Sequence, residues 1–311
     1  MTTDGGDARD SLRGFDPAVL DAERGLLMSL AYRMLGTVAD AEDAVQETYA
    51  RWVRLSPPER DAIENPAAWL TRVVGRVCLD QLGSARARRE SYVGEWLPEP
   101  LPGGAGMFAA PRSEDPLDRV TLDESVSTAL LVVLESLTPA ERVAFVLHDV
   151  FAVPFAEIAE IVGRSPEACR QLASSARRHV RERRSGAATR EHHDEVVRAF
   201  MAAAATGALD ELLAVLDPDV RLVSDGGGLA SAAIRPVLGG DHVARFILGL
   251  KEKRGPALEL SVAETADGLT LAMGEGGAID SVLIADVRGD RIATIWIMRN
   301  PEKLRLWNSP G

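Results

Sequence analysis

Between residues 17 and 90 the apolar positions recur with the period of an α-helix. The stretch 19–36 forms one apolar face from Leu20, Leu26, Leu27, Leu30, Ala31, Met34 and Leu35. A second helix over 38–55 follows Thr37, carries acidic residues and ends at the proline pair that begins at Pro57. This part of the chain is therefore predicted to be α-helical.

A third helix over 67–82 follows Pro66, a residue that suits the first turn of a helix. Trp69 lies on its apolar side and is interpreted as a core residue, and Gly83 is expected to end the helix. From 92 to 118 the helical period disappears, and WLPEPLPGGAGMFAAPRSEDP is rich in proline and glycine. We interpret this stretch as an interdomain linker.

A second helical block, 122–184, ends in two helices joined by a short turn. The first of the two is expected to bury Phe155, Ile158, Ala159 and Val162. Gly163 permits the tight turn, Ser165 is a good N-cap, and Pro166 follows at the first position of the second helix. Together these signals predict a helix-turn-helix.

Beyond the tract 185–191 the pattern changes to mixed helices and strands. Helices are predicted over 193–205, 209–216 and about 241–253. Strands are predicted at 220–223, 258–263, 270–273, 279–287 and 291–298, and RGDR is a hairpin signal between the last two. The C-terminal part is therefore predicted to be an α+β domain.

The composition is that of a folded chain with two or three domains. Of its 311 residues 46% are hydrophobic and 26% charged, and the net charge is −12, which argues against non-specific coating of nucleic acid. Cys78 and Cys169 lie far apart without CxxC spacing, so no disulfide framework or zinc module is indicated. An acidic start and the lack of a long apolar run predict a soluble, cytoplasmic protein without a membrane span.

The second helix of the helix-turn-helix concentrates positive charge. Its predicted exposed side consists of Glu167, Arg170, Gln171, Ser174, Arg177 and Arg178. A helix that enters the major groove of DNA needs such charge to approach the phosphates. Arg170 and Gln171 are placed to reach base edges, whereas Arg177 and Arg178 lie where phosphate contact is expected. The alternative interpretation is a solvated basic end of a helix.

Two helices of the first block carry opposite charge. Residues 37–47 contain Asp40, Glu42, Asp43 and Glu47 without a basic residue. Residues 71–90 contain Arg72, Arg76, Arg86, Arg88 and Arg89 against Asp80 and Glu90. Each helix alone is compatible with a solvated face. Together with the helix-turn-helix, they indicate a protein that binds another protein with one helix and DNA with others.

Three stretches of the chain resemble a known family. YRMLGTVADAEDAVQETYARW resembles region 2 of the sigma-70 class, in the form found in extracytoplasmic-function (ECF) sigma factors, and NPAAWLTRVVGRVCLDQL resembles its continuation. LTPAERVAFVLHDVFAVPFAEIAEIVGRSPEACRQLASSARRHV resembles region 4. The matches have the expected order and flank the expected linker.

The C-terminal part resembles a SnoaL-like (NTF2-like) domain, a cone of helices against a curved antiparallel sheet. The ECF subgroup with this extension, the sigma J-like factors of actinobacteria, has three further motifs. They correspond here to YVGEWLPEP at 92–100, DGGG at Asp225–Gly228 and NPEKL at Asn300–Leu304. Leu229 stands where relatives often place a lysine.

The resemblance implies a multidomain chain in which the sigma regions are all-α. Its parts would be a flexible N-terminus over 1–16, region 2 over 17–90, a linker over 91–120, region 4 over 121–185 and a SnoaL-like regulatory domain over 191–311. The implied function is that of a sigma factor, which binds core RNA polymerase and directs initiation at −35 and −10 promoter elements. Neither catalytic residues, a metal nor a cofactor is implied.

The resemblance also assigns residues to partners. The acidic helix would dock on the β′ clamp helices of the polymerase, and the β flap is a further implied partner surface. The implied polymerase contacts are Asp40, Glu42, Asp43, Gln46 and Glu47. Contacts to the −10 element would come from Arg72, Arg76, Asp80, Arg86, Arg88 and Arg89, and the loop near Gly83 would cradle a flipped base. Family members commonly have asparagine in place of Arg76. Contacts to the −35 element would come from Ser165, Glu167, Arg170, Gln171, Ser174, Arg177 and Arg178.

We further hypothesise that the C-terminal domain is a built-in regulator in place of a separate anti-sigma factor. It would pack against the linker and regions 2 and 4 through Trp96, Leu97, Pro98, Asp225, Gly226, Gly227, Gly228, Asn300, Pro301, Lys303 and Leu304. The glycines are expected to permit a sharp turn or close packing. Asp225, His242 and Trp296 are candidates to line a pocket, although each also has a purely structural interpretation. His192 and His193 are expected to face solvent.

Two other function classes stay open at this point. A ligand-sensing helix-turn-helix regulator would have no use for the helices that resemble region 2. A SnoaL-like enzyme fused to a DNA-binding module would need an acid–base pair, for which only Asp225 with His242 is a candidate. No GxSxG, HExxH or P-loop motif is present.

Overall fold

The computed structural model describes residues 17–90, 92–103, 127–183 and 185–309, without the side chains of 17–19 and 85–90. The chain forms two compact units. Among the described residues, the first comprises 17–86 and 136–178; the second comprises 87–90, 92–103, 127–135, 179–183 and 185–309. The described linker residues 92–103 and the segment 127–135 thus belong to the unit that contains the C-terminal domain.

The first unit begins with the predicted helices, α2 (Pro17–Leu35), α3 (Val38–Arg54) and α5 (Pro66–Glu90). The apolar face predicted for α2 is buried except for Leu26, which is half-buried. Thr37 caps α3 by accepting a hydrogen bond from the amide of Asp40. Trp69, predicted as a core residue, is half-buried and lies edge-on to the buried Trp52 at a ring separation of 5.1 Å.

Two features of this helical block differ from the prediction. Helix α5 does not end at Gly83 but continues to Glu90, because Gly83 adopts a helical conformation and helix-forming residues follow it. The expected base-cradling loop at Gly83 is therefore helix. A short helix α4 (Pro57–Asp61) follows α3, since Ser56 and Glu59 form a capping box and Pro57 suits the first helical position.

The helix-turn-helix is confirmed. It comprises α9 (Phe155–Val162) and α10 (Pro166–Arg183), preceded by α8 (Pro139–Phe145) and a π-helical turn (Val146–Val150). Gly163 ends α9 with a φ of 69°, a left-handed conformation that glycine tolerates. The buried face of α9 consists of Ile158 and Ile161, whereas Phe155, Ala159 and Val162 are half-buried.

The second unit contains a six-stranded sheet in the order β2-β1-β6-β5-β4-β3. Its strands are β1 (Leu216–Asp225), β2 (Val237–Leu238), β3 (Glu259–Thr265), β4 (Gly268–Glu275), β5 (Ala278–Arg288) and β6 (Arg291–Met298). The sheet is mixed rather than wholly antiparallel, because β1 pairs in parallel with β6. That pairing joins the first strand to the last, which a local hairpin signal cannot predict.

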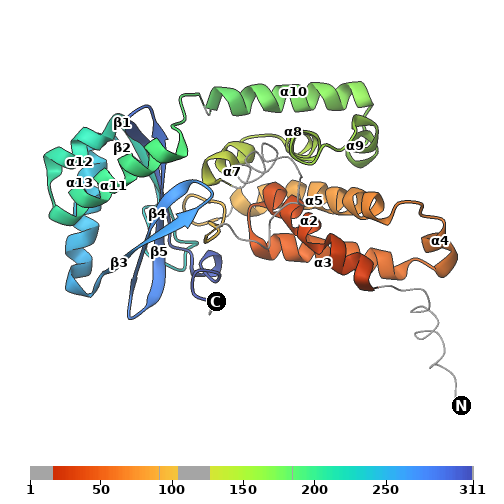
Figure 1. The fold of residues 1–311 in the computed structure, drawn as a ribbon, viewed down its shortest axis with the longest axis horizontal. Helices are drawn as coiled ribbons and strands as arrows, with labels where there is room; N and C mark the ends of the chain where they lie inside the picture. The colour runs from red at the N-terminus through yellow and green to blue at the C-terminus, as the bar shows by residue number, and fades with distance from the viewer. Residues whose placement is uncertain (1–16, 91, 104–126, 184, 310–311) are drawn as a thin grey trace, which may run out of the picture. The chain divides into compact units, whose positions relative to one another are not determined.

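The two faces of the sheet are covered differently. One face packs against α11 (Arg190–Thr206), α12 (Leu209–Val215) and α13 (Gly240–Arg254), around Phe200, Leu212 and Ile295 (Figure 1). The other face presents Val282, Ile284, Trp296 and Met298, which pack against Leu97 of the linker and Leu304. Ala129 and Val132 of α7 (Thr128–Glu135) also pack there. The linker and α7 are thus part of the core of this unit.

No helix in the described residues is long and apolar enough to cross a membrane.

Candidate functional site

The acidic helix α3 exposes three of the five residues predicted to bind polymerase. Glu42, Asp43 and Gln46 are exposed and make no side-chain hydrogen bond or ion pair with a described residue. Asp40 is half-buried and accepts a hydrogen bond of 2.6 Å from the Thr37 hydroxyl. Glu47 pairs with Arg51 at 3.0 Å. Three of the five side chains are therefore available to a partner as they stand.

Two of the arginines predicted to contact the −10 element make contacts with α9 in the same unit. Arg72 pairs with Glu160 at 2.9 Å, and Arg76 donates to the carbonyl of Ile161 at 2.8 Å while lying 3.5 Å from Asp80. Gly75 faces Ile161, and a Cβ there would lie 3.2 Å from the Ile161 side chain, closer than an ordinary contact. The side chains of Arg86, Arg88 and Arg89 lie outside the described residues.

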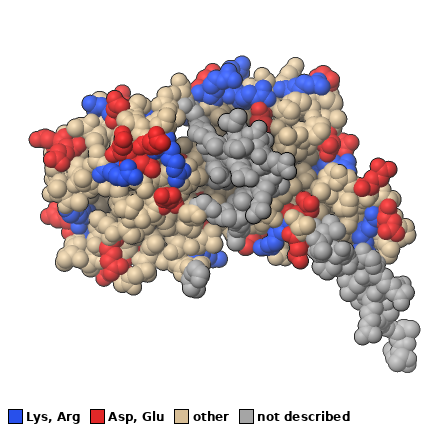
Figure 2. Space-filling model, viewed as in Figure 1, with Lys and Arg blue, Asp and Glu red and all other residues tan. Residues whose placement is uncertain are grey.

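Helix α10 presents most of the predicted −35 set on its outer side. Gln171, Ser174 and Arg178 are exposed and have no polar side-chain partner among the described residues. Arg170 pairs with the exposed Glu167 at 3.3 Å, and Ser165 caps the helix through the amide of Ala168. Figure 2 shows basic side chains gathered along this helix. The distribution matches what a groove-binding helix requires.

Arg177 is the exception on this helix. Its guanidinium makes hydrogen bonds of 2.6 and 3.2 Å to the two carboxylate oxygens of Asp149. This pairing raises the pKa of Arg177 above its usual value. Arg177 therefore ties α10 to the π-helical turn, and only a rearrangement would free it for phosphate.

The predicted regulatory residues converge on a buried ion pair in the second unit. Lys303 Nζ lies 2.7 Å from Asp225 Oδ2, and the two side chains are 7% and 0% exposed. Asp225 also accepts hydrogen bonds from the Tyr92 hydroxyl at 2.7 Å and the Leu97 amide at 2.9 Å. Lys303 donates in turn to the Leu97 carbonyl at 2.6 Å. We call Tyr92, Leu97, Asp225, Asn300 and Lys303 the linker cluster.

Further contacts around the linker cluster also fix the linker in place. Asn300 donates to the Tyr92 hydroxyl at 2.9 Å, and the Lys303 ammonium lies 4.2 Å from the centre of the Trp96 ring. Burial, together with the hydrogen bond to Asp225, raises the pKa of Tyr92. Leu97, Pro98 and Leu304 are buried, whereas Pro301 is exposed at the start of a 3₁₀ turn (Pro301–Lys303). Every polar group of the ion pair therefore has a partner, which a buried charge requires.

The DGGG glycines permit the close packing that the sequence suggested. A Cβ on Gly226 would lie 2.2 Å from the carbonyl oxygen of Ala230. Gly227 has a φ of 61°, and a Cβ there would lie 2.4 Å from the Asn300 amide. Gly228 has a φ of 72° and faces Val93. Larger residues would therefore push the loop away from the NPEKL segment and the linker.

In the described residues the three pocket candidates have structural roles: Asp225 belongs to the linker cluster, Trp296 packs on the face that the linker covers, and the His242 ring contacts the Leu238 carbonyl. The expectation that His193 faces solvent is wrong, because its ring is buried between the Asp194 carboxylate and the Ala285 carbonyl, at 3.0 and 3.1 Å. No group of side chains in the described part of the chain could hold a metal ion.

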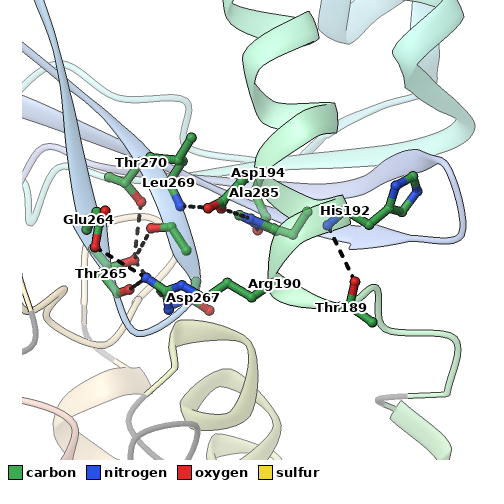
Figure 3. A network of polar contacts seen from close by, with 12 residues as sticks. Thr189, Arg190, His192, Asp194, Glu264, Thr265, Asp267, Leu269, Thr270 and Ala285 are labelled. Carbon is green, nitrogen blue, oxygen red and sulfur yellow. Dashed lines mark hydrogen bonds and ion pairs between the residues drawn. The ribbon is translucent and has the colours of Figure 1, made fainter.

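A second connection, between α7 and the β3–β4 hairpin, was missed in the sequence. Asp267 accepts hydrogen bonds from the amides of Thr128 and Ala129 at 2.8 and 3.1 Å, and the Ser127 hydroxyl accepts one from Leu130. These acceptors satisfy the free amides at the start of α7. The start of α11 packs on the same hairpin, where Asp194 accepts from the Leu269 amide (Figure 3). Nothing in local sequence shows that Asp267 caps a distant helix.

Replacing Asp267 by alanine should weaken this connection. Loss of the helix-capping carboxylate is expected to lower the free energy that protects α7 from opening by about 1–2 kcal/mol. Hydrogen exchange of the peptide that contains Thr128 and Ala129 measures this change. Asp290→Ala is the control, since Asp290 lies in an exposed hairpin turn and pairs with His192 at 2.8 Å. Equal exchange in the two variants would contradict the role of Asp267.

Comparison with known families supports the resemblance seen in the sequence. The model of sigma-70 region 2 matches residues 19–88, and the model of sigma-70 region 4 matches residues 127–180. The second match begins at α7, the helix that packs in the unit of the C-terminal domain.

Whole-chain relatives share the same organisation. The chain is 44% identical over 299 residues to the ECF RNA polymerase sigma factor SigJ of Mycobacterium tuberculosis, covering 91% of each chain. The crystal structure of M. tuberculosis SigJ matches with a TM-score of 0.71 and 42% identity, over 95% of this chain and 99% of that one. An NTF2-like protein from Burkholderia xenovorans matches 39% of this chain and 98% of its own, at 16% identity and a TM-score of 0.27. This last likeness concerns the fold alone.

Proposed function

We propose, on the premise that this chain belongs to the ECF sigma factors of the sigma-70 class, that its NTF2-like domain restrains transcription by holding the linker and α7. Sigma factors of this class bind core RNA polymerase and promoter DNA to direct initiation, and they are not catalytic. Acting on the transcribing enzyme, the protein would work in the cytoplasm. With a restraint inside the chain, a separate anti-sigma factor is not required.

The observation that carries this proposal is the linker cluster. The linker connects the two sigma regions, yet its backbone at Leu97 is held on both sides, by Asp225 at the amide and by Lys303 at the carbonyl. Trp307 extends the hold by donating to the Pro100 carbonyl at 2.8 Å. A linker held in this way cannot adapt its path to a partner without breaking several buried polar contacts.

The first unit supports a restrained state as well. Arg72 and Arg76, proposed for the −10 element, are engaged by Glu160 and the Ile161 carbonyl of α9. Promoter DNA would have to replace these contacts before the two DNA-binding helices read separate elements. Because the Arg72 and Glu160 side chains are 38% and 64% exposed, this pair adds little stability, so the main restraint is assigned to the buried linker cluster.

We assign the partner surfaces as follows. The exposed acidic side of α3 would dock on the β′ clamp helices, and region 4 on the β flap. The outer side of α10 would read the −35 element, with Arg170 and Gln171 toward the bases and Arg178 toward the phosphates. Arg72, Arg76 and the C-terminal end of α5 would contact the −10 element.

A variant that loosens the linker without cutting the chain tests the restraint. Tyr92→Phe combined with Trp307→Phe removes the hydroxyl that joins Asp225 to Asn300 and the indole bond to Pro100. Each lost hydrogen bond destabilises the held linker by about 1 kcal/mol relative to the released linker. Run-off transcription with core polymerase is therefore expected to rise several-fold. Hydrogen exchange at Leu97 reports independently whether the linker has loosened.

Two results separate the outcomes of this experiment. Faster exchange at Leu97 with unchanged or lower transcription would overturn the restraint while leaving the sigma function intact. Thr206→Ala is a matched control, since this exposed hydroxyl bonds only within its own helix end, and it should change neither measurement.

A further inference from the structure

The NTF2-like domain contains a cavity of about 220 Å³ on the side of the sheet that packs against α11 and α13. Its walls are mostly apolar and come from Phe200 and Ala204 of α11, Ile247 and Leu250 of α13, and Leu271 and Ile297 of the sheet. Leu260 and Val262 of the edge strand β3 also line it, although they are 48% and 62% exposed. Such exposed apolar side chains at the opening of a cavity are typical of a ligand site.

Three basic residues line the same cavity, and only one of them forms an ion pair with a described carboxylate. Arg254 makes hydrogen bonds of 2.7 and 2.5 Å to the two carboxylate oxygens of Asp280. Lys251 donates to the carbonyls of Ala204 and Ala205 at the end of α11. Arg254 has a direct carboxylate partner and Lys251 is exposed to water, so neither group needs a ligand.

Arg299 is the exception. It is half-buried, and its guanidinium donates to the Ser281 hydroxyl at 3.1 Å and to the Ser231 carbonyl. Burial lowers the pKa of Arg299, although the nearby Asp280 carboxylate acts in the opposite direction. Asp280 is linked to Arg299 through the Ser281 hydroxyl, which donates to Asp280 at 2.7 Å, whereas Arg254 makes direct hydrogen bonds to both oxygens of Asp280. Two guanidinium groups beside the apolar cavity therefore share one carboxylate, and Arg299 has no direct ion pair with a described residue.

We propose that this cavity binds a small amphipathic carboxylate, with its apolar body between α11, α13 and the sheet and its carboxylate on Arg299. Arginine presents a planar set of donors that matches a carboxylate, and the low polarity around it favours a charged partner. A neutral ligand would leave Arg254 and Arg299 to share the single carboxylate of Asp280, and a cationic ligand would meet like charge. An aliphatic body would also cover Leu260 and Val262.

Octanoate and 1-octanol test the proposal, because they share a chain length and differ in charge. Isothermal titration of the full chain should show one octanoate site per chain, with at least tenfold weaker binding of 1-octanol. Arg299→Gln should remove this difference by weakening octanoate alone. Arg245→Gln is the matched control: Arg245 lies on α13 but is exposed and paired with Asp241 at 2.8 Å, so binding should not change.

Ala204→Phe fills the cavity from α11, where Ala204 is only half-buried, and should abolish binding of both probes. Circular dichroism checks that each variant is folded. The ratio of octanoate to 1-octanol affinity is measured on the unaltered chain, so it tests the proposal even if a variant does not fold. The proposal is overturned if octanoate does not bind, if both probes bind equally, or if a folded Ala204→Phe chain binds octanoate unchanged. Because the readout is binding, it is independent of the proposed restraint on transcription.

Discussion

Replacing Lys303 by methionine is expected to lower the free energy of unfolding of the NTF2-like unit by about 3–5 kcal/mol. Methionine is similar in length, so the variant mainly removes the charge from a site that is 7% exposed. The Asp225 carboxylate then stays buried with the Tyr92 hydroxyl and two amides as donors, but without a counter-charge. Leaving one member of a buried ion pair alone costs far more than the pair contributes when intact.

Hydrogen exchange of peptides from β5 and β6 measures this loss within the unit that contains the pair. Asp225→Asn should be similarly destabilising, because it leaves the Lys303 ammonium buried. The double variant should recover part of the loss, since neither charge then stays unpaired. A surface pair provides the control: Asp241→Asn should cost less than about 1 kcal/mol, as Asp241 and Arg245 are both exposed. A Lys303→Met loss no larger than that would show that the buried pair does not hold this unit together.

The elements that a local pattern determines could be predicted. The apolar period located α2 and α3, and the turn chemistry at Gly163 and Ser165 located the helix-turn-helix. Gly83 shows the limit of such reasoning, because a glycine ends a helix only where the backbone turns left-handed, and at Gly83 it does not.

The contacts that depend on tertiary placement could not be predicted from local patterns. The resemblance to the sigma J-like subgroup indicated that 92–100, the DGGG loop and NPEKL act together. It did not predict the buried ion pair and hydrogen bonds that connect them. Tyr92 and Trp307 act through single polar atoms, and Asp267 caps a helix 139 residues before it in the chain. Single-residue contacts of this kind leave no period in the sequence. For the same reason the cavity beside Arg299 was missed, since its lining comes from separate helices and strands.

Reversing charge on α3 should have the largest effect on function. Glu42→Lys combined with Asp43→Lys is expected to weaken binding to core polymerase by at least about a hundredfold at low ionic strength. Both side chains are exposed and have no partner in the described chain, whereas Ala41, Ala44 and Val45 of the same helix are buried. The substitutions therefore change the outer surface without altering the core. Fluorescence anisotropy of labelled protein against core polymerase measures the affinity.

The control must carry the same change in net charge. Asp61→Lys with Glu64→Lys provides it, since both are exposed residues of the segment that follows α3. If general electrostatic steering alone favoured binding, the two double variants would weaken it equally, and salt would remove the effect of both. A specific dock on α3 requires that the Glu42 and Asp43 variant lose affinity while the Asp61 and Glu64 variant keeps most of it. Equal losses of affinity would therefore contradict the assignment of α3 to the polymerase interface. They would show that binding depends only on the net charge of the chain.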